Sequence, residues 1–278
     1  MMSPEKWRDT VDPFSLPYQT FTLKSVLGYP HAGNDVFYVE GVYAGKTVRA
    51  YVKAARQPGA DTEREASVLR RLHGFPTPAV LDAGEGFCVT AAMEGERLSV
   101  IVGENACRQS LAYMDEYGEM LARLHGVKGD FPPVRHRRFF DVPEQAYFER
   151  YDLRFAADFL HGNRPQATVR CFCHGDFHYA NVLWQNGHIS GVLDFELCGI
   201  GDRDFDIAWA IIRRPGQRFM NTQAETDRFL SGYARRGSCD VQRVRYYMAL
   251  IYAHFYAIGR NDAEYAAYVR QWLWDNAR

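Results

Sequence analysis

The chain has 278 residues, 47% hydrophobic and 24% charged, which is enough to bury one large core or two moderate ones. Because 33 basic residues nearly balance 34 acidic ones, the net charge of -1 gives no reason to expect a nucleic acid or an anionic membrane as partner. The first residues lack an apolar leader, and the longest apolar run, near residues 248–258, is interrupted by His254 and too short to span a membrane. We therefore expect a cytoplasmic protein that acts on a small molecule; the oligomeric state stays open.

Six cysteines are spread along the chain without a C-x-x-C pair, the spacing that zinc sites and redox motifs often use. Cys171 and Cys173 alternate on a predicted strand. Because cysteine is often a small buried apolar residue, we expect free thiols and no zinc site.

The first ninety residues predict strands with one helix. Alternating apolar and polar residues predict strands at 21–27, 36–42 and 47–54, and shorter runs at 79–82 and 87–91 add two more. The loop 28–35 is rich in turn residues but holds only two glycines. An ordinary hairpin loop and a loop that contacts phosphates are both compatible with it.

Two charged residues of this part are candidates for a functional role. Lys53 lies in the third strand, where Val48, Ala50 and Val52 are expected to face the core and Lys53 the other side. Glu65 lies in a helix predicted over 62–72. Its side chain can either close the helix start in a capping box with Thr62 or face inward toward a basic partner.

After residue 98 the pattern becomes mostly helical. A stripe of four aromatic residues beginning at Tyr147 is expected to be core rather than a ligand site. Apolar residues at helical spacing predict helices near residues 111–125, 143–160, 201–209, 222–235, 241–258 and 263–274.

The segment 171–210 carries the residues that indicate chemistry. Asp176 is followed by Asn181 five residues later and by Asp194 thirteen residues after that. Short apolar runs flank Asn186-Gly187, a strong signal for a tight hairpin. We therefore expect the three polar side chains to meet at one end of two paired strands.

This set of residues suits phosphoryl transfer, in which a protein mainly positions the nucleophile and neutralises charge with Mg²⁺. One carboxylate can accept the proton of a hydroxyl, while an amide oxygen and a second carboxylate hold the metal. His174, Asp176 and His178 also form H-x-D-x-H, which a metal-dependent hydrolase could use, but the joint spacing with Asn181 and Asp194 favours phosphoryl transfer. His174 is expected to bond the loop backbone, and the role of His178 stays open.

The run His174-Gly175-Asp176-Phe-His-Tyr-Ala-Asn181, followed by Leu193-Asp194-Phe195-Glu196 and Asp206-Ile207-Ala208, resembles the aminoglycoside phosphotransferase and choline kinase superfamily. The resemblance implies an α+β, two-lobed, protein-kinase-like fold. A small antiparallel lobe would span residues 1–92, a hinge 93–97 and a mostly helical lobe 98–278. The cleft between the lobes would bind MgATP, with GTP not excluded.

The resemblance also implies roles for single residues. Asp176 would be the catalytic base, and Asn181 and Asp194 would hold Mg²⁺. Lys53 would contact the nucleotide phosphates and pair with Glu65, for which Glu63 is the fallback.

At the hinge, backbone groups of Ala91 and Met93 would contact the nucleobase. Asp206 would steady the catalytic loop, although a carboxylate in the first turn of a helix is also favoured by the helix dipole.

The acceptor is the open part of this prediction. Glu196 stands where a protein kinase has the glycine of D-F-G, so it is expected to act near the metal or the acceptor. Aromatic residues of the last helices, with Asp202, Asp204 and Glu264 nearby in sequence, favour an amine-bearing hydroxyl compound such as an aminoglycoside or a related antibiotic. The alternatives are a small-metabolite kinase acting on a choline-, ethanolamine- or homoserine-like compound, or a catalytically inactive nucleotide-binding regulatory module.

Overall fold

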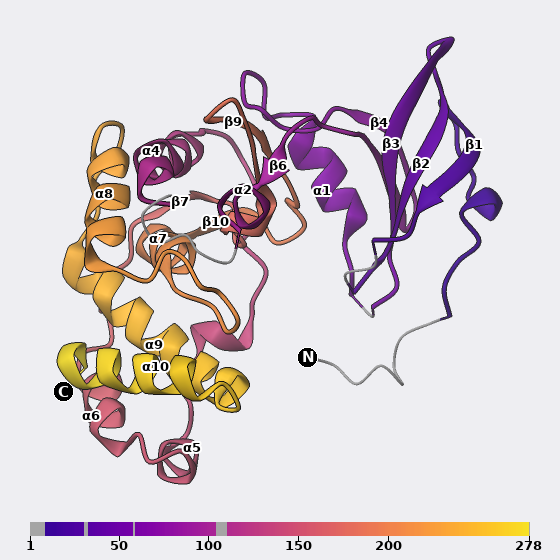
Figure 1. Ribbon diagram of the computed structural model, residues 1–278. Helices are drawn as coiled ribbons and strands as arrows, with labels where there is room; N and C mark the ends of the chain where they lie inside the picture. Colours follow the sequence, from indigo (N-terminus) through magenta and orange to yellow (C-terminus); the bar gives the residue numbers. More distant parts are fainter. Residues whose placement is uncertain (1–8, 31–32, 58, 104–109, 278) are drawn as a thin grey trace. The chain divides into compact units, whose positions relative to one another are not determined.

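The computed structural model describes residues 9–30, 33–57, 59–103 and 110–277. They divide into two compact units (Figure 1). The first comprises the described part of Met1–Gly95 with Leu183–Gln185 and Ile189–Leu197, and the second comprises Glu96–Val182, Asn186–His188 and Cys198–Arg278. Within the described ranges, no helix has both the length and the apolar character needed to cross a membrane.

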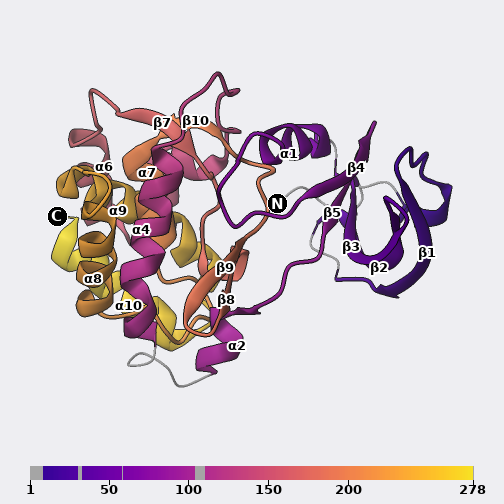
Figure 2. The same ribbon diagram turned by 90° about the horizontal axis from the view of Figure 1, so that it is seen from above.

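The first unit is built on a five-stranded antiparallel sheet with the strand order β1-β2-β3-β5-β4. The three strands predicted from alternation and the two predicted from shorter runs are all present. They are β1 (Phe21–Gly28), β2 (Asp35–Tyr43), β3 (Lys46–Ala54), β4 (Val80–Gly84) and β5 (Phe87–Ala91), preceded by the short 3-10 turn η2 (Pro13–Ser15). The helix α1 (Thr62–Leu69) lies beside β4 and β5 in both views (Figures 1 and 2).

The core of this sheet follows the predicted alternation. Ala50 and Val52 are fully buried on the core face with Val39 and Val89, and Val48 packs against the same cluster. This arrangement confirms the predicted inward face of β3, and it leaves Lys53 on the opposite face.

The entry into β1 is held by a single buried carboxylate. Asp82 is 4% exposed. Its Oδ2 accepts the backbone N–H groups of Gln19, Thr20 and Phe21 at 2.8, 2.8 and 2.9 Å. Burial would raise the pKa of Asp82, but these backbone hydrogen bonds favour the charged form and lower it.

The second unit is mainly helical. Its helices are α2 (Leu98–Val102), α4 (Met114–His125), α5 (Gln145–Arg150), α6 (Arg154–Gly162), α7 (Arg203–Ile211), α8 (Gln223–Ala234), α9 (Val241–Gly259) and α10 (Ala263–Asn276). Its 3-10 turns are η3 (Leu111–Tyr113), η4 (Arg138–Phe140) and η5 (Tyr179–Asn181). Its strands are β6 (Glu96–Arg97), β7 (Arg170–Cys173) and β10 (Gly199–Asp202), of which the last two pair antiparallel.

Two glycines allow α4 and α8 to pack closely side by side (Figure 2). A Cβ added at Gly118 would lie 2.0 Å from the backbone oxygen of Phe229, and one at Gly232 would lie 2.0 Å from that of Asp115. Because both obstacles are backbone atoms, neither can move aside at low cost.

The prediction of one helix over 143–160 was wrong. The segment forms α5 and α6, and between them Asp152 adopts a left-handed conformation with φ of 53°. Arg270 of α10 donates to the carbonyl oxygen of Asp152 at 2.9 Å, so a distant residue stabilises the break. The buried aromatic residue here is Phe148, and the expected stripe, including Tyr147 and Tyr151, is only half-buried.

The hairpin predicted around Asn186-Gly187 is present as β8 (Val182–Gln185) and β9 (His188–Val192). Both turn residues have a positive φ, 52° for Asn186 and 81° for Gly187, as tight two-residue hairpin turns require. Asn181 immediately precedes β8, and Asp194 follows β9 after one intervening residue.

Candidate functional site

The predicted site residues fall into two groups. Lys53, Glu65, Asp194 and Glu196 come together in the first unit, and Asp176 and Asn181 come together in the second.

Lys53 is the centre of the first group. Its Nζ lies 2.7 Å from Glu65 Oε2, 2.7 Å from Asp194 Oδ1 and 3.8 Å from Glu196 Oε2. Burial alone would lower the pKa of the Lys53 ammonium, but the three carboxylates raise it well above its ordinary value. Lys53 therefore stays protonated.

The second interpretation of Glu65, an inward-facing ion pair, is the correct one. The start of α1 is capped by Asp61, whose Oδ1 accepts the Arg64 N–H at 2.9 Å, so Glu65 does not close a capping box with Thr62. The Glu65 side chain is 6% exposed. Its Oε1 accepts the backbone N–H of Phe195 at 3.2 Å, which ties α1 to the segment that carries Asp194.

The first group has the chemistry of a divalent-cation site. One ammonium faces three carboxylates, which leaves an excess of negative charge that a divalent cation can compensate. The Asp194 side chain is 43% exposed, so it can reach a ligand outside the protein core. Carboxylate oxygens are the ligands that Mg²⁺ prefers.

Glu196 belongs to the same group through a second contact. Its Oε2 accepts a hydrogen bond from Asn34 Nδ2 at 2.8 Å, while Asn34 Oδ1 accepts the Arg56 N–H at 3.2 Å. Asn34 lies in the turn-rich loop 28–35, of which residues 31 and 32 lie outside the described part of the chain. No sequence motif predicts the Asn34 contact.

The loop of the second group, which carries Asp176 and Asn181, is held by α7. Asp206 accepts the backbone N–H groups of His174 and Gly175 at 2.9 and 3.0 Å, one on each carboxylate oxygen. His174 Nδ1 accepts the backbone N–H of Asp176 at 3.2 Å. These bonds confirm the structural roles expected for Asp206 and His174.

The two oxygens of the Asp176 carboxylate have different surroundings. Oδ1 accepts the indole N–H of Trp209 at 2.7 Å and an N–H of Arg137 at 3.2 Å. Oδ2 lies 3.5 Å from Asn181 Nδ2 and 3.6 Å from His178 Nε2, so its contacts are long. One oxygen is thus tightly held, and the other is the better placed to accept a proton.

Electrostatics keeps Asp176 ionised. Burial would raise its pKa, but the nearby imidazole of His178 and the charges of Arg137 and Arg214 lower that pKa well below its ordinary range. The Asp176 side chain is therefore a carboxylate, an acceptor-only group, at neutral pH.

Asn181 and His178 complete this loop. The Asn181 side chain donates through Nδ2 to the carbonyl oxygen of Asp176 at 3.1 Å, which leaves its amide oxygen as the ligand atom that a metal would use. His178 Nδ1 accepts the Ala180 N–H at 3.2 Å and caps η5. His178 therefore acts first on the loop backbone.

Sequence reasoning missed Arg137 entirely and gave Trp209 no specific role. Arg137 also donates to the carbonyl oxygen of Gly175, and its guanidinium lies 4.1 Å from the centre of the Trp209 ring. Neither contact has a local signature, because the 131–144 segment and α7 approach the catalytic loop only in the folded chain.

Of the two residues expected to contact a nucleobase, Ala91 is placed by a backbone hydrogen bond and Met93 by a side-chain contact. The Ala91 N–H donates to the Ala79 carbonyl oxygen at 2.8 Å, so it is engaged within the sheet. Met93 lies against the hairpin, since its sulfur would be 3.3 Å from a Cβ at Gly191. A contact through Ala91 would therefore use its carbonyl group.

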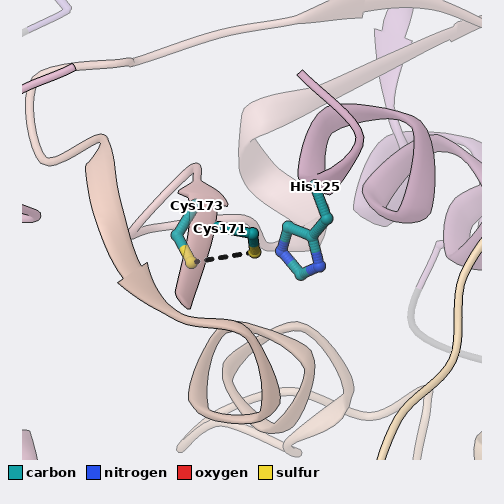
Figure 3. A group of neighbouring side chains, drawn as sticks. All are labelled: His125, Cys171 and Cys173. Atoms are coloured by element: carbon teal, nitrogen blue, oxygen red, sulfur yellow. Dashed lines mark hydrogen bonds between the residues drawn. The ribbon is translucent and has the colours of Figure 1, made fainter. Parts of the chain in front are cut away.

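Three side chains that can bind metals, His125, Cys171 and Cys173, also lie together in the second unit (Figure 3). Both ring nitrogens of His125 are engaged, with Tyr233 Oη at 2.7 Å and Asp206 Oδ2 at 3.1 Å. None of the five cysteines in the described residues forms a disulfide, and Cys107 lies outside those residues. Within this cluster, His125 supports Asp206.

A cavity of about 270 Å³ opens in the second unit beside the loop that carries Asp176. Gly175 borders it, the rings of Phe140, Phe205 and Tyr247 line it, Asp202 supplies a carboxylate, and Arg170 and His136 supply basic groups. Tyr247 Oη donates to Asp202 Oδ2 at 2.5 Å. Of the other carboxylates that the sequence indicated near the acceptor, Asp204 pairs with Arg203 and Glu264 with Arg213, both at 2.9 Å.

Comparison with known proteins identifies the family. The model of the phosphotransferase enzyme family, APH, matches residues 28–247. A probable aminoglycoside 3'-phosphotransferase of Lactococcus lactis subsp. lactis (strain IL1403) is 26% identical over 106 residues, which are 36% of this chain and 38% of that protein. The matched segment thus spans well under half of that relative.

Solved structures share the fold over nearly the whole chain. A thermostable mutant of aminoglycoside phosphotransferase APH(4)-Ia, in a ternary complex with ADP and hygromycin B, matches with a TM-score of 0.59 and 18% identity over 94% of each chain. The gentamicin complex of APH(2")-IIa matches with a TM-score of 0.56 and 17% identity over 92% of this chain and 91% of that one.

Macrolide 2'-phosphotransferase MphH from Brachybacterium faecium matches with a TM-score of 0.52 and 18% identity over 91% of this chain and 92% of that one. At these sequence identities the solved structures establish only the fold, which is the predicted α+β, protein-kinase-like class. The family itself is shown by the family model, which matches most of the chain. The chain belongs to the phosphotransferase enzyme family.

Proposed function

We propose that the protein transfers the γ-phosphoryl group of ATP to a hydroxyl of a small molecule. The observation that carries this proposal is the position of Lys53, 2.7 Å from both Glu65 and Asp194. In protein kinases a strand lysine that pairs with a helix glutamate contacts the nucleotide phosphates, and an aspartate of the D-F-G type holds the metal. Here the same three residue types meet in the first unit.

Asp176 is the proposed catalytic base. Its ionised carboxylate accepts a hydrogen bond from the acceptor hydroxyl through Oδ2, orients that hydroxyl and takes its proton as the phosphorus–oxygen bond forms. Asn181 and Asp194 are the proposed ligands of Mg²⁺, since the hairpin β8–β9 separates them as the motif requires. When bound, Mg²⁺ would neutralise the charge on the phosphate oxygens.

The nucleotide is proposed to be ATP, because the related APH(4)-Ia structure holds ADP. The Ala91 carbonyl and the Met93 backbone are the proposed contacts of the nucleobase. GTP stays an alternative, to be decided by competition. An inactive nucleotide-binding module is disfavoured, because such a module has no need for an ionised Asp176 whose Oδ1 is held by Trp209 and Arg137.

For the acceptor we propose an amine-bearing hydroxyl compound of the aminoglycoside type. The observation that supports an amine is that the related structures hold hygromycin B and gentamicin. The cavity beside Gly175 offers an amine three aromatic rings and the Asp202 carboxylate, although Arg170 and His136 also line it and reduce its negative charge. Aromatic rings and a carboxylate together suit an organic cation. Glu196 is retained as a proposed acceptor or metal contact.

A second candidate is a small amino alcohol of the choline, ethanolamine or homoserine type. The cavity of about 270 Å³ favours it, because pockets for drug-sized ligands usually have about 300–1,000 Å³. An aminoglycoside would place only one of its rings there.

A paired acceptor panel tests the proposal. Each antibiotic or small amino alcohol with a primary or secondary amine is assayed with MgATP beside its N-acetylated form, which has the same hydroxyls but no ammonium group. Choline, whose quaternary nitrogen cannot be acetylated, is assayed beside its neutral carbon analogue 3,3-dimethyl-1-butanol. We expect the amines to be phosphorylated and the acetylated forms to react at least tenfold less. Asp202→Asn should weaken amine binding and leave nucleotide affinity unchanged. Phosphorylation confined to neutral or anionic compounds would overturn the choice of acceptor.

A further inference from the structure

The Asp176 carboxylate is held unequally, and Trp209 makes the shortest contact. The indole N–H of Trp209 lies 2.7 Å from Oδ1, whereas the Arg137 donor lies 3.2 Å from the same oxygen. The nearest groups to Oδ2, on Asn181 and His178, are 3.5 Å or more away. A carboxylate anchored by one oxygen presents the other in a fixed direction.

Trp209 is itself immobilised by its neighbours. It is 5% exposed, and its ring packs against those of Phe139 and Phe255 with centroid distances of 5.1 and 5.7 Å. The guanidinium groups of Arg137 and Arg214 lie 4.1 and 4.9 Å from the ring centre. The indole N–H therefore has one available direction, and it points to Asp176.

The place of Trp209 in α7 links it to the loop backbone. Asp206 lies three residues earlier, on the same helix face, and bonds the N–H groups of His174 and Gly175. One helix, α7, thus fixes both the backbone of the loop at His174 and Gly175 and the side chain of Asp176. Arg137, by contrast, lies outside α7: it precedes the three-residue turn η4 and is held by the Gly175 carbonyl oxygen and by the Trp209 ring itself.

We propose that Trp209 is a positioning residue for phosphoryl transfer: it holds Oδ1 of Asp176 so that Oδ2 faces the acceptor hydroxyl. This inference rests on the proposed function, in which Asp176 is the base. Trp209 does not touch the substrate, and it takes no part in the proton transfer itself.

Two substitutions separate the N–H group from the bulk of the ring. Trp209→Phe keeps an aromatic ring but removes the donor. Trp209→His retains a five-membered ring whose Nε2 occupies the place of the indole Nε1, so it can still donate, although it fills less space. Trp274→Phe, at a residue that is 46% exposed, controls for loss of a tryptophan elsewhere.

The kinetic probe is MgATP with water as acceptor, measured as ADP release, together with MgADP affinity. Because misplacement by about 1 Å can cost about 100-fold in rate, we expect Trp209→Phe to lower kcat about 10- to 100-fold with KM and MgADP affinity unchanged. Trp209→His should recover part of that loss. In an Asp176→Asn background, Trp209→Phe should have no further effect, because its only route is through Asp176.

The NMR signal of the Trp209 indole N–H gives a second readout, which requires neither turnover nor a folded Trp209 variant. The chain has five tryptophans, and Trp209→Phe identifies the Trp209 indole N–H resonance in the NMR spectrum. Asp176→Asn should move that resonance upfield, since the charged acceptor is lost. If Trp209→Phe does not fold, assignment by selective labelling serves the same purpose.

The outcomes separate the inference from the function that it deepens. An unmoved indole resonance in Asp176→Asn, or a kcat of Trp209→Phe equal to that of the wild type, would refute the role of Trp209. An equal loss of kcat in Trp209→Phe and Trp209→His would show that the size of the ring, and not its N–H donor, is what matters, and would also refute the proposed role. An Asp176→Asn variant with full activity would instead refute the proposed function.

Discussion

Replacing Glu65 by glutamine should weaken nucleotide binding without unfolding the protein. The change removes one charge and keeps the shape, so Lys53 loses a partner at 2.7 Å but keeps Asp194, also at 2.7 Å. Glutamine Oε1 can still accept the Phe195 N–H, so the tie to the Asp194 segment persists. A hydrogen bond between charged groups contributes about 1.5–3 kcal/mol, which corresponds to about 10- to 150-fold in affinity.

The assay is calorimetric titration with MgADP, followed by ADP release under MgATP. Glu63→Gln is the matched control, because it makes the same chemical change on an exposed residue of the same helix. We expect Glu65→Gln to bind MgADP at least tenfold more weakly and Glu63→Gln to bind it normally. Equal affinities in both variants and the wild type would refute the role assigned to the Lys53–Glu65 pair.

Three further predictions concern the metal, the β1 entry and the helix packing. Asp194→Ala should abolish the Mg²⁺ dependence of nucleotide binding, because a proposed metal ligand is lost. We expect this variant to bind the nucleotide with the same affinity in Mg²⁺ and in EDTA, and an unchanged requirement for Mg²⁺ would contradict the prediction. Asp82→Asn should lower the free energy of unfolding by about 2 kcal/mol at pH 7. Because the pKa of Asp82 is lowered in the folded protein, the wild type should keep this advantage above pH of about 4 and lose it as the pH falls through the folded pKa. A difference in Tm that does not change with pH would contradict this prediction. Gly118→Ala should lower the free energy of unfolding by about 1–3 kcal/mol, because its Cβ meets a backbone oxygen; unfolding in urea at the wild-type midpoint would contradict it.

Local patterns were sufficient for much of the fold. The Asn186-Gly187 turn, the five strands and α8 to α10 depend on residues within a few positions, and the structure places them near their predicted bounds. The break between α5 and α6 was missed because Asp152 is held by Arg270, more than a hundred residues later. Helical periodicity carries no information about such a contact.

The candidate site divides in the same way. Residues with a fixed offset, such as Asp176, Asn181 and Asp194, could be found from the sequence because the chemistry requires that spacing. Arg137 and Asn34 could not, since each contacts a site residue through a separate segment and has no motif of its own. The boundaries 1–92, 93–97 and 98–278 and the roles of single residues stay predictions.

Transfer of phosphorus-labelled phosphate from ATP to the acceptor panel tests the central claim most directly. The wild type is compared with Asp176→Asn, each with Mg²⁺ and with EDTA. We predict labelled product only for the wild type with Mg²⁺, while Asp176→Asn still binds MgADP because the Lys53 group is intact. Labelled product from Asp176→Asn at the wild-type rate, or transfer in EDTA equal to that in Mg²⁺, would contradict a metal-dependent phosphotransferase with Asp176 as its base.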